Sequence, residues 1–368
     1  MKTLRTLFRN LVGVVFIFSG FVKGIDPLGT VYRMQDYFLA FGTGWANSLA
    51  LPLTIFLCTL EFMVGISLLF NLWLRIMTWA LLPLMTFFTI LTFFDAVYNL
   101  VPDCGCFGDA IKLSNVETFI KNLVLMAFVI PVFLWRKKYK SALPASGELG
   151  ALVLTAALFT GLSVYCLWHL PVIDFSDWRT GNTVSRRVDK PVRFYVTYKN
   201  RYTGETQEFL SPNYPWNDST WMANWMFVSQ RVDNSLQNEI LLMIEDTAGN
   251  DLSETFLNIP DYNFFLVAYD LTATDRTAFE KLQPLADHAS GAGYSFICLT
   301  STLPSEIERF KSETGTRIDF YNADDVVLKS MIRSNPGLIL LKDGKILAKW
   351  HYNDFPEWQW MKKRCIDK

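Results

Sequence analysis

Residues 104–109 read Cys-Gly-Cys-Phe-Gly-Asp, and they lie between two strongly apolar stretches, 76–99 and 116–135. Two cysteines one residue apart can close only into a small, strained ring, and strained disulfides are the ones that exchange readily. Cys104 and Cys106 are therefore a candidate redox pair, and the alternative is a structural staple of a short loop. A metal site is not indicated, because no further cysteine or histidine lies nearby in the sequence.

The two apolar stretches belong to a composition that is typical of membrane proteins. Hydrophobic residues make up 51% of the 368 residues and charged residues only 19%. The apolar excess lies in residues 1–175, whereas 176–368 read as a soluble domain. Crossing a bilayer takes about 20 apolar residues. Five stretches are interpreted as spans: 11–24, 49–70, 76–99, 116–135 and 149–170.

The basic residues that flank these spans predict the orientation of the chain. They are Lys2, Arg5, Arg9, Arg75, Arg136, Lys137, Lys138 and Lys140. Alternation of the spans puts all of them on one face, which is then cytoplasmic. The other face receives the 25–48 loop, the 100–115 loop with the cysteine pair, and the C-terminal domain. The cysteines would thus face an oxidising compartment, where a disulfide persists. The net charge of −1 gives no indication of a nucleic-acid partner.

Two ionisable residues, Lys23 and Glu61, lie inside predicted spans. Both come near the middle of the bilayer on antiparallel helices, so each should face the bundle interior and find the other. Gly20 and Gly24 form a small-xxx-small pair that allows close helix approach. The charged pair can be a structural ion pair that fixes helix packing, or it can serve a proton- or quinone-linked role. Asp95 near the outer end of the third span is expected to be interfacial.

The sequence just after the cysteine motif predicts the start of the fourth span. Ser114 followed by Glu117 is a capping-box pattern. The cysteine loop should therefore lie directly before a helix N-terminus, with Lys112 close by in the sequence. Positive helix ends and nearby cations favour thiolate.

Three motifs together resemble the DoxX and MauE families of small four-helix membrane proteins. They are Phe-Ser-Gly-Phe-Val-Lys-Gly at 18–24, Leu-Glu-x-x-x-Gly at 60–65, and the Cys-Gly-Cys-Phe-Gly-Asp motif. The resemblance covers about residues 5–140 and implies a four-helix membrane domain, 1–140, in the bacterial inner membrane. The fifth span and a linker would occupy 141–175. For the MauE branch it also implies support of periplasmic disulfide chemistry beside a thioredoxin-like partner.

The outer half begins with strands and continues as an alternating α/β pattern. Segments 193–199 and 205–210 alternate around a turn and predict a hairpin. The aromatic-rich stretch 211–236, with Pro212, Pro215, Trp216, Trp221 and Trp225, is expected to be irregular. Strands are expected at 240–245, 264–269, 294–299, 338–341 and 346–350, and helices at 275–289 and 305–314.

This order of elements over about 236–355 resembles the thioredoxin-like fold, with Pro336 at the position of that family's cis-proline. The family's Cys-x-x-Cys is missing, since Thr274 and Thr277 stand where its cysteines would be. Threonine cannot carry thiol chemistry, so residues 176–368 are expected to form a periplasmic docking module. The groove beside Pro336 would take an extended peptide by strand addition.

Two functions fit these patterns. In the first, the protein supports periplasmic thiol–disulfide redox through Cys104 and Cys106, and a periplasmic thioredoxin-like or substrate protein is the partner. In the second, it is a non-catalytic membrane scaffold whose cysteine pair is a staple. No cofactor is identified, although a quinone fits the first function. The Cys-Gly-Cys motif favours the redox function, and the missing Cys-x-x-Cys favours the scaffold.

Overall fold

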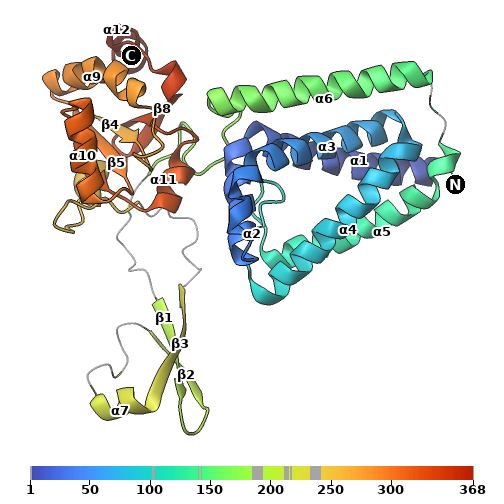
Figure 1. The fold of residues 1–368 in the computed structure, drawn as a ribbon, viewed down its shortest axis with the longest axis horizontal. Helices are drawn as coiled ribbons and strands as arrows, with labels where there is room; N and C mark the ends of the chain where they lie inside the picture. The colour runs from blue at the N-terminus through green and yellow to red at the C-terminus, as the bar shows by residue number, and fades with distance from the viewer. Residues whose placement is uncertain are drawn as a thin grey trace.

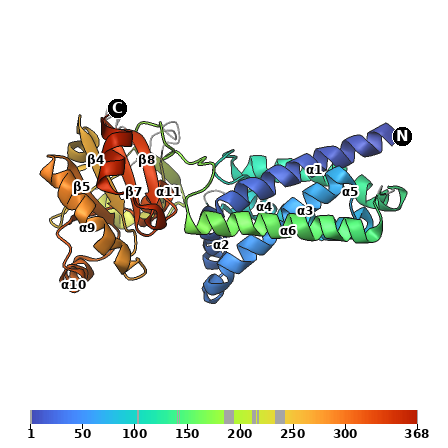
Figure 2. The ribbon, with the colours of Figure 1, turned by 90° about the horizontal axis from the view of Figure 1, so that it is seen from above.

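The computed structural model describes residues 2–101, 104–139, 141, 143–184, 194–210, 215, 218–232 and 242–367. Within these residues, five helical segments are long and apolar enough to cross a membrane, as predicted. They are α1 (Lys2–Ile25), α3 (Ala50–Phe70) with the short helix η1 (Gly44–Leu49) before it, α4 (Leu74–Tyr98), α5 (Asn115–Leu134) and α6 (Ala145–Trp168). They run side by side along one bundle (Figures 1 and 2).

Helix α2 (Pro27–Ala40) occupies the segment that was expected to be a loop. The Asp26 side chain caps it by accepting a hydrogen bond from the Gly29 amide at 3.0 Å, and Pro27 is its first residue. Asp followed by Pro is a strong helix-start signal, which the apolar pattern of the segment did not reveal. Figure 1 shows α2 standing across the end of the bundle that lies away from the N-terminus.

Helices α1 and α3 approach each other through glycines. A Cβ atom on Gly20 would lie 2.7 Å from the Phe62 backbone nitrogen, and one on Gly65 would lie 2.6 Å from the Ile17 nitrogen. Gly24 instead faces α6, where a Cβ would lie 2.3 Å from Phe159. The two predicted small residues on α1 therefore serve two different neighbours, α3 and α6.

A five-stranded mixed sheet forms the core of the α/β region (residues 242–367). Its strands lie in the order β6 (Asp319–Asn322), β5 (Ser295–Thr300), β4 (Tyr262–Val267), β7 (Gly337–Lys342) and β8 (Lys345–His351). The pairs β6–β5 and β5–β4 are parallel, and β4–β7 and β7–β8 are antiparallel. The apolar run of β4 is buried on both faces, as a central strand requires.

Helices cover the sheet on both sides. Helices α9 (Arg276–Gly291) and α10 (Pro304–Thr314) pack on one core, which includes Phe264 and Cys298. Helix α11 (Asp325–Met331) packs on the other, which includes Trp178. The shorter helices are α8 (Ser253–Leu257), η4 (Tyr352–Asp354), α12 (Trp358–Met361) and η5 (Lys362–Ile366).

One expectation for the α/β region needs correction, and short elements of this region were missed. Residues 242–245 form no strand, only isolated bridges from Glu245 to Asp251 and Asn322; residues 240 and 241 lie outside the described part. Strand β6 and helix α11 were not predicted. With four and seven residues, both are too short to show a period in the sequence.

A second sheet precedes the α/β region. The predicted hairpin is present as β1 (Phe194–Asn200) and β2 (Thr206–Leu210), although Arg193 lies outside the described residues. The expectation that 211–236 is irregular is wrong for two segments. Helix α7 (Ser219–Asn224) leads into β3 (Trp225–Val232), which pairs antiparallel with β1. Trp221 and Trp225 stack at 5.5 Å, while Pro212 and Trp216 lie outside the described residues.

Candidate functional site

The cysteine loop is a compact turn at the α2 end of the bundle. The sulfurs of Cys104 and Cys106 are 3.2 Å apart, and both residues are half-buried free thiols. Gly105 and Gly108 have φ angles of +67° and +52°, which side chains other than glycine rarely adopt. The Gly108 amide donates to the Gly105 carbonyl at 3.0 Å and closes the turn. The backbone thus holds two thiols in contact.

Contacts from α1 hold this loop against the bundle. The Ser19 hydroxyl lies 2.9 Å from the Cys106 carbonyl oxygen and 3.2 Å from Glu61 Oε2. The rings of Phe18 and Phe107 lie 5.5 Å apart. The loop therefore rests directly on the polar residues inside the bundle.

The two charged residues predicted inside the spans form an ion pair. Lys23 Nζ lies 2.7 Å from Glu61 Oε1 and 2.6 Å from Oε2, with side chains 9% and 2% exposed. Lys23 also lies 5.2 Å from the centre of the Phe88 ring. Ser19 links this pair to the cysteine loop, because its hydroxyl contacts both Glu61 and the Cys106 carbonyl oxygen.

The electrostatic surroundings of the two thiols differ. The hydrogen bond from Cys104 lowers the pKa of Cys106, and the ammonium groups of Lys121 and Lys23 lower it further against the effect of burial. The pKa of Cys104 is raised by the same hydrogen bond and by burial. Cys106 is accordingly the thiol that more readily becomes a thiolate, the nucleophilic form.

The cation beside the cysteines is not the one nearest in sequence. Lys112 forms an exposed ion pair with Asp177 after α6. Lys121, which is on α5, instead lies 4.3 Å above the Phe107 ring. The capping box is present, with the Ser114 amide donating to Glu117 at 2.9 Å.

Two further residues beside the cysteines were not expected there. The Tyr37 hydroxyl on α2 donates a hydrogen bond to Asp95 Oδ2 and also hydrogen-bonds to the Cys104 thiol. Asp95, on the last turn of α4, is fully buried within the protein. Tyr37 was missed because its segment was expected to be a loop. The sequence signal for this part of the site was Asp95, an acidic residue at the end of an apolar span.

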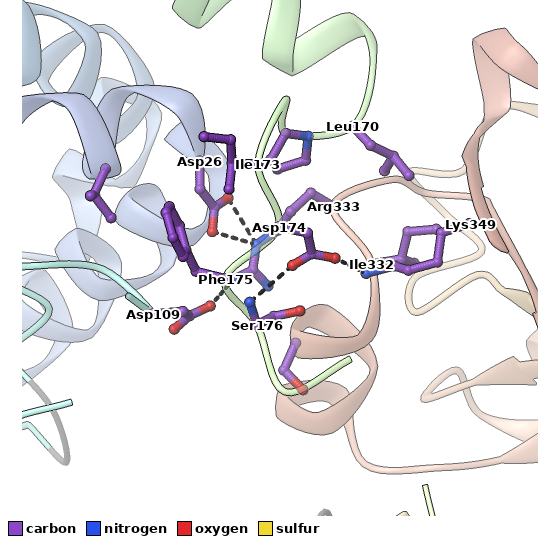
Figure 3. A pocket seen from close by; sticks show the side chains of 13 residues that line it. Asp26, Asp109, Leu170, Ile173, Asp174, Phe175, Ser176, Ile332, Arg333 and Lys349 are labelled. Carbon is purple, nitrogen blue, oxygen red and sulfur yellow. Dashed lines mark hydrogen bonds and ion pairs between the residues drawn. The ribbon is translucent and has the colours of Figure 1, made fainter. Parts of the chain in front are cut away.

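The α/β region contacts the cysteine loop through Arg333, which comes just before β7. Its guanidinium lies 2.9 Å from Asp26 Oδ1 and 2.9 Å from Asp109 Oδ2, and its side chain is 10% exposed (Figure 3). Asp109 closes the cysteine motif, and Asp26 caps α2. Next to this network, Lys349 pairs with Asp174 at 2.7 Å, so the segment after α6 is tied to β8.

The predicted groove residues lie close to this junction. The Asn335–Pro336 peptide is cis, and the Thr274 hydroxyl donates to Asn335 Oδ1 at 3.3 Å. Thr277 is exposed at the start of α9 and hydrogen-bonds to Asp275. The structure thus brings Thr274 beside the Asn335–Pro336 peptide, which follows Arg333 closely in the chain.

A cavity of about 240 Å³ opens between α2, the cysteine loop and α11. It is lined by Gly105 of the cysteine loop, by Arg33 and Asp36 of α2, and by Lys329 and Arg333 of the α/β region. The Tyr32 and Tyr269 hydroxyls lie 3.1 Å apart, joining α2 to the end of β4. Among the described residues, no group of three histidine, cysteine or acidic side chains is placed to hold a metal ion.

Comparison with known proteins agrees with the membrane half of this picture. Residues 1–136 match the family model described as methylamine utilisation protein MauE, close to the 1–140 expected from the motifs. Searches of curated proteins and of solved structures gave no match. The N-terminal part of this chain is therefore a MauE-like membrane domain.

Proposed function

We propose that this protein is a thiol–disulfide exchange component of the bacterial inner membrane, with Cys104 and Cys106 as its redox pair. The MauE-like match over residues 1–136 supports the membrane setting. Three arginines gather at the N-terminal end of the bundle: Arg5 lies over the Trp135 ring, Arg9 over the Tyr139 ring and Arg136 over the Phe133 ring. The positive-inside rule makes that end cytoplasmic, so the cysteine loop and the α/β region are periplasmic.

The observation that carries the proposal is the contact between two thiols of opposite character. Their sulfurs are 3.2 Å apart, the pKa of Cys106 is lowered, and the pKa of Cys104 is raised, each chiefly by the hydrogen bond between them. An exchange protein needs one thiol that attacks and one that resolves. A structural staple needs no such difference.

The exchange step follows from this asymmetry. The Cys106 thiolate attacks a disulfide of the partner protein, a mixed disulfide forms, and the partner's other sulfur leaves as a thiolate. Cys104 loses its proton and attacks the Cys106 sulfur, which releases the partner's second thiolate. The result is a Cys104–Cys106 disulfide and a reduced partner, and the reverse steps oxidise a partner. A membrane quinone is the class of acceptor that would reoxidise the pair, taking up two electrons and two protons.

The α/β region serves as the docking module in this proposal, with the chain divided into 1–140, 141–175 and 176–368. Three parallel strands continued by an antiparallel pair support a thioredoxin-like fold for this region. Thr274 and Thr277 cannot exchange thiols, so its contribution is contact. Arg333 supports that role, since it binds Asp109 directly beside the cysteine turn.

Trapping tests the proposal. In a chain whose other cysteines (Cys58, Cys166, Cys298 and Cys365) are replaced, Cys104→Ser should accumulate a mixed disulfide through Cys106 after acid quenching and alkylation. The matched variant Cys106→Ser should accumulate far less. Equal amounts of adduct in the two variants, or none in either, would contradict the assignment.

The second candidate function is a non-catalytic scaffold. The threonines at 274 and 277 favour it, as does the Arg333 bridge, which could serve only to hold the loop against its partner domain. The absence of a mixed disulfide in both trapping variants would support this function.

A further inference from the structure

The proposed function does not yet name the base that accepts the proton of the Cys104 thiol. Cys104 must lose its proton to attack Cys106, yet its thiol is half-buried. In the reduced pair the hydrogen bond to Cys106 and burial both raise the pKa of Cys104, and burial persists once Cys106 is in the mixed disulfide. Since a thiol attacks only as its thiolate, the resolving step needs a base beside Cys104.

Two residues from different helices stand beside Cys104. Tyr37 on α2 hydrogen-bonds to the Cys104 thiol and donates its own proton toward Asp95 Oδ2 on the last turn of α4. The Asp95 carboxylate has no exposed surface, and its Oδ1 atom has no hydrogen-bond partner among the described residues.

This arrangement is a poor structural anchor. A buried carboxylate with one satisfied oxygen pays a desolvation cost that one tyrosine hydrogen bond offsets only in part. A salt bridge would be the usual compensation, but the described residues give the Asp95 side chain only Tyr37. Its Oδ1 atom, which has no hydrogen-bond partner among the described residues, leaves the carboxylate a lone pair that can take up a proton.

The charged and titratable groups around the pair come from every helix that packs on the loop. They are Lys23 on α1, Arg33 and Tyr37 on α2, Glu61 on α3, Asp95 on α4 and Lys121 on α5. The ammonium groups act on Cys106, whereas Tyr37 and Asp95 act on Cys104. Among the described residues, the base in line with Cys104 is therefore Asp95, reached through Tyr37.

We propose that Tyr37 and Asp95 form a proton relay that deprotonates Cys104 in the resolving step, an inference that rests on the proposed exchange function. The Cys104 S–H bond breaks as its proton passes to the Tyr37 oxygen, and the Tyr37 O–H proton passes to Asp95. Tyr37 ends neutral, Asp95 ends as a carboxylic acid, and the Cys104 thiolate attacks the Cys106 sulfur. Tyr37 touches the reacting group and is catalytic; Asp95 acts through it and is a positioning residue that stores the proton.

The test follows the resolving step directly. Reduced full-length protein in detergent, with Cys58, Cys166, Cys298 and Cys365 replaced, is mixed with oxidised glutathione. Acid-quenched samples are alkylated and their masses are measured by mass spectrometry, which distinguishes the Cys106–glutathione adduct from the intramolecular disulfide. Tyr37→Phe and Asp95→Asn are compared with Tyr98→Phe. This matched control changes an exposed tyrosine at the end of α4, the helix that carries Asp95.

The relay predicts a specific pattern. Tyr37→Phe and Asp95→Asn should form the adduct at the normal rate. They should resolve it at least about 10-fold more slowly, because a general base typically accelerates a step by about 10²- to 10⁴-fold. Their resolving rate should rise about tenfold per pH unit, because solvent hydroxide replaces the base, while the unaltered chain and Tyr98→Phe show a shallower rise. Asp95→Glu should restore part of the rate.

The outcomes separate this inference from the function beneath it. If the unaltered chain closes its disulfide and Tyr37→Phe resolves with the same rate and pH profile, the relay is wrong and the exchange function stands. If the unaltered chain forms neither adduct nor intramolecular disulfide, the exchange function itself fails, and the relay falls with it.

Discussion

Replacing Glu61 with glutamine should strand the ammonium group of Lys23 inside the bundle. The pair has side chains only 9% and 2% exposed, with both Glu61 oxygens within 2.7 Å of Lys23 Nζ. Removing one partner of such a buried pair costs about 3–5 kcal/mol, because the other charge is left without compensation.

The assay is unfolding of purified protein in detergent, followed by circular dichroism. Glu61→Gln should lose those few kcal/mol, and adding Lys23→Met should recover most of them, because the double variant buries no unpaired charge. Asp177→Asn is the control: it breaks the exposed Lys112–Asp177 pair and should cost less than about 1 kcal/mol. A double variant that is no more stable than Glu61→Gln would refute the idea that the pair explains these residues.

Three further predictions follow from the fold. Gly20→Ala should push α1 from α3, since its Cβ would lie 2.7 Å from the Phe62 nitrogen, and the melting temperature in detergent should fall by several degrees. Burial lowers the pKa of His351 to about 4, below its unfolded value of about 6.5, so its contribution to stability is complete above pH 6.5 and is lost as the pH falls toward 4. Denaturation of the full chain across that window should show this loss, and His351→Gln should reduce it. A phosphatase fused after Tyr139 should be inactive and one fused after Trp178 active, and the reverse pattern would overturn the orientation.

The parts of the fold that repeat a pattern could be predicted from the sequence. Long apolar runs gave the five spans, and a lysine and a glutamate alone in such runs had few partners other than each other. The apolar runs of β4 and β5 gave the centre of the sheet. Short elements such as β6 and α11 could not be found in this way, because four to seven residues hold too little of any period.

The surroundings of the cysteine pair were harder to predict. Tyr37 reaches Cys104 only because Asp26 and Pro27 start a helix across the end of the bundle. Arg333 lies more than 200 residues from both Asp26 and Asp109 along the chain, and no local pattern marks such a contact. The cation nearest in sequence, Lys112, pairs with Asp177 instead. Lys121 contacts Phe107 of the cysteine loop because of its position on α5, which the spacing along the sequence does not reveal.

The reduction potential of the Cys104–Cys106 pair tests the central claim most directly. The measurement is a titration of full-length protein in glutathione buffers with the other cysteines replaced. Stabilisation of the Cys106 thiolate favours the reduced form, and a ring with only Gly105 between the cysteines disfavours the oxidised form. The account therefore predicts a value near about −200 mV, in the range of exchange-active pairs. A value below about −300 mV, typical of structural bridges, or two thiols that never oxidise would contradict it.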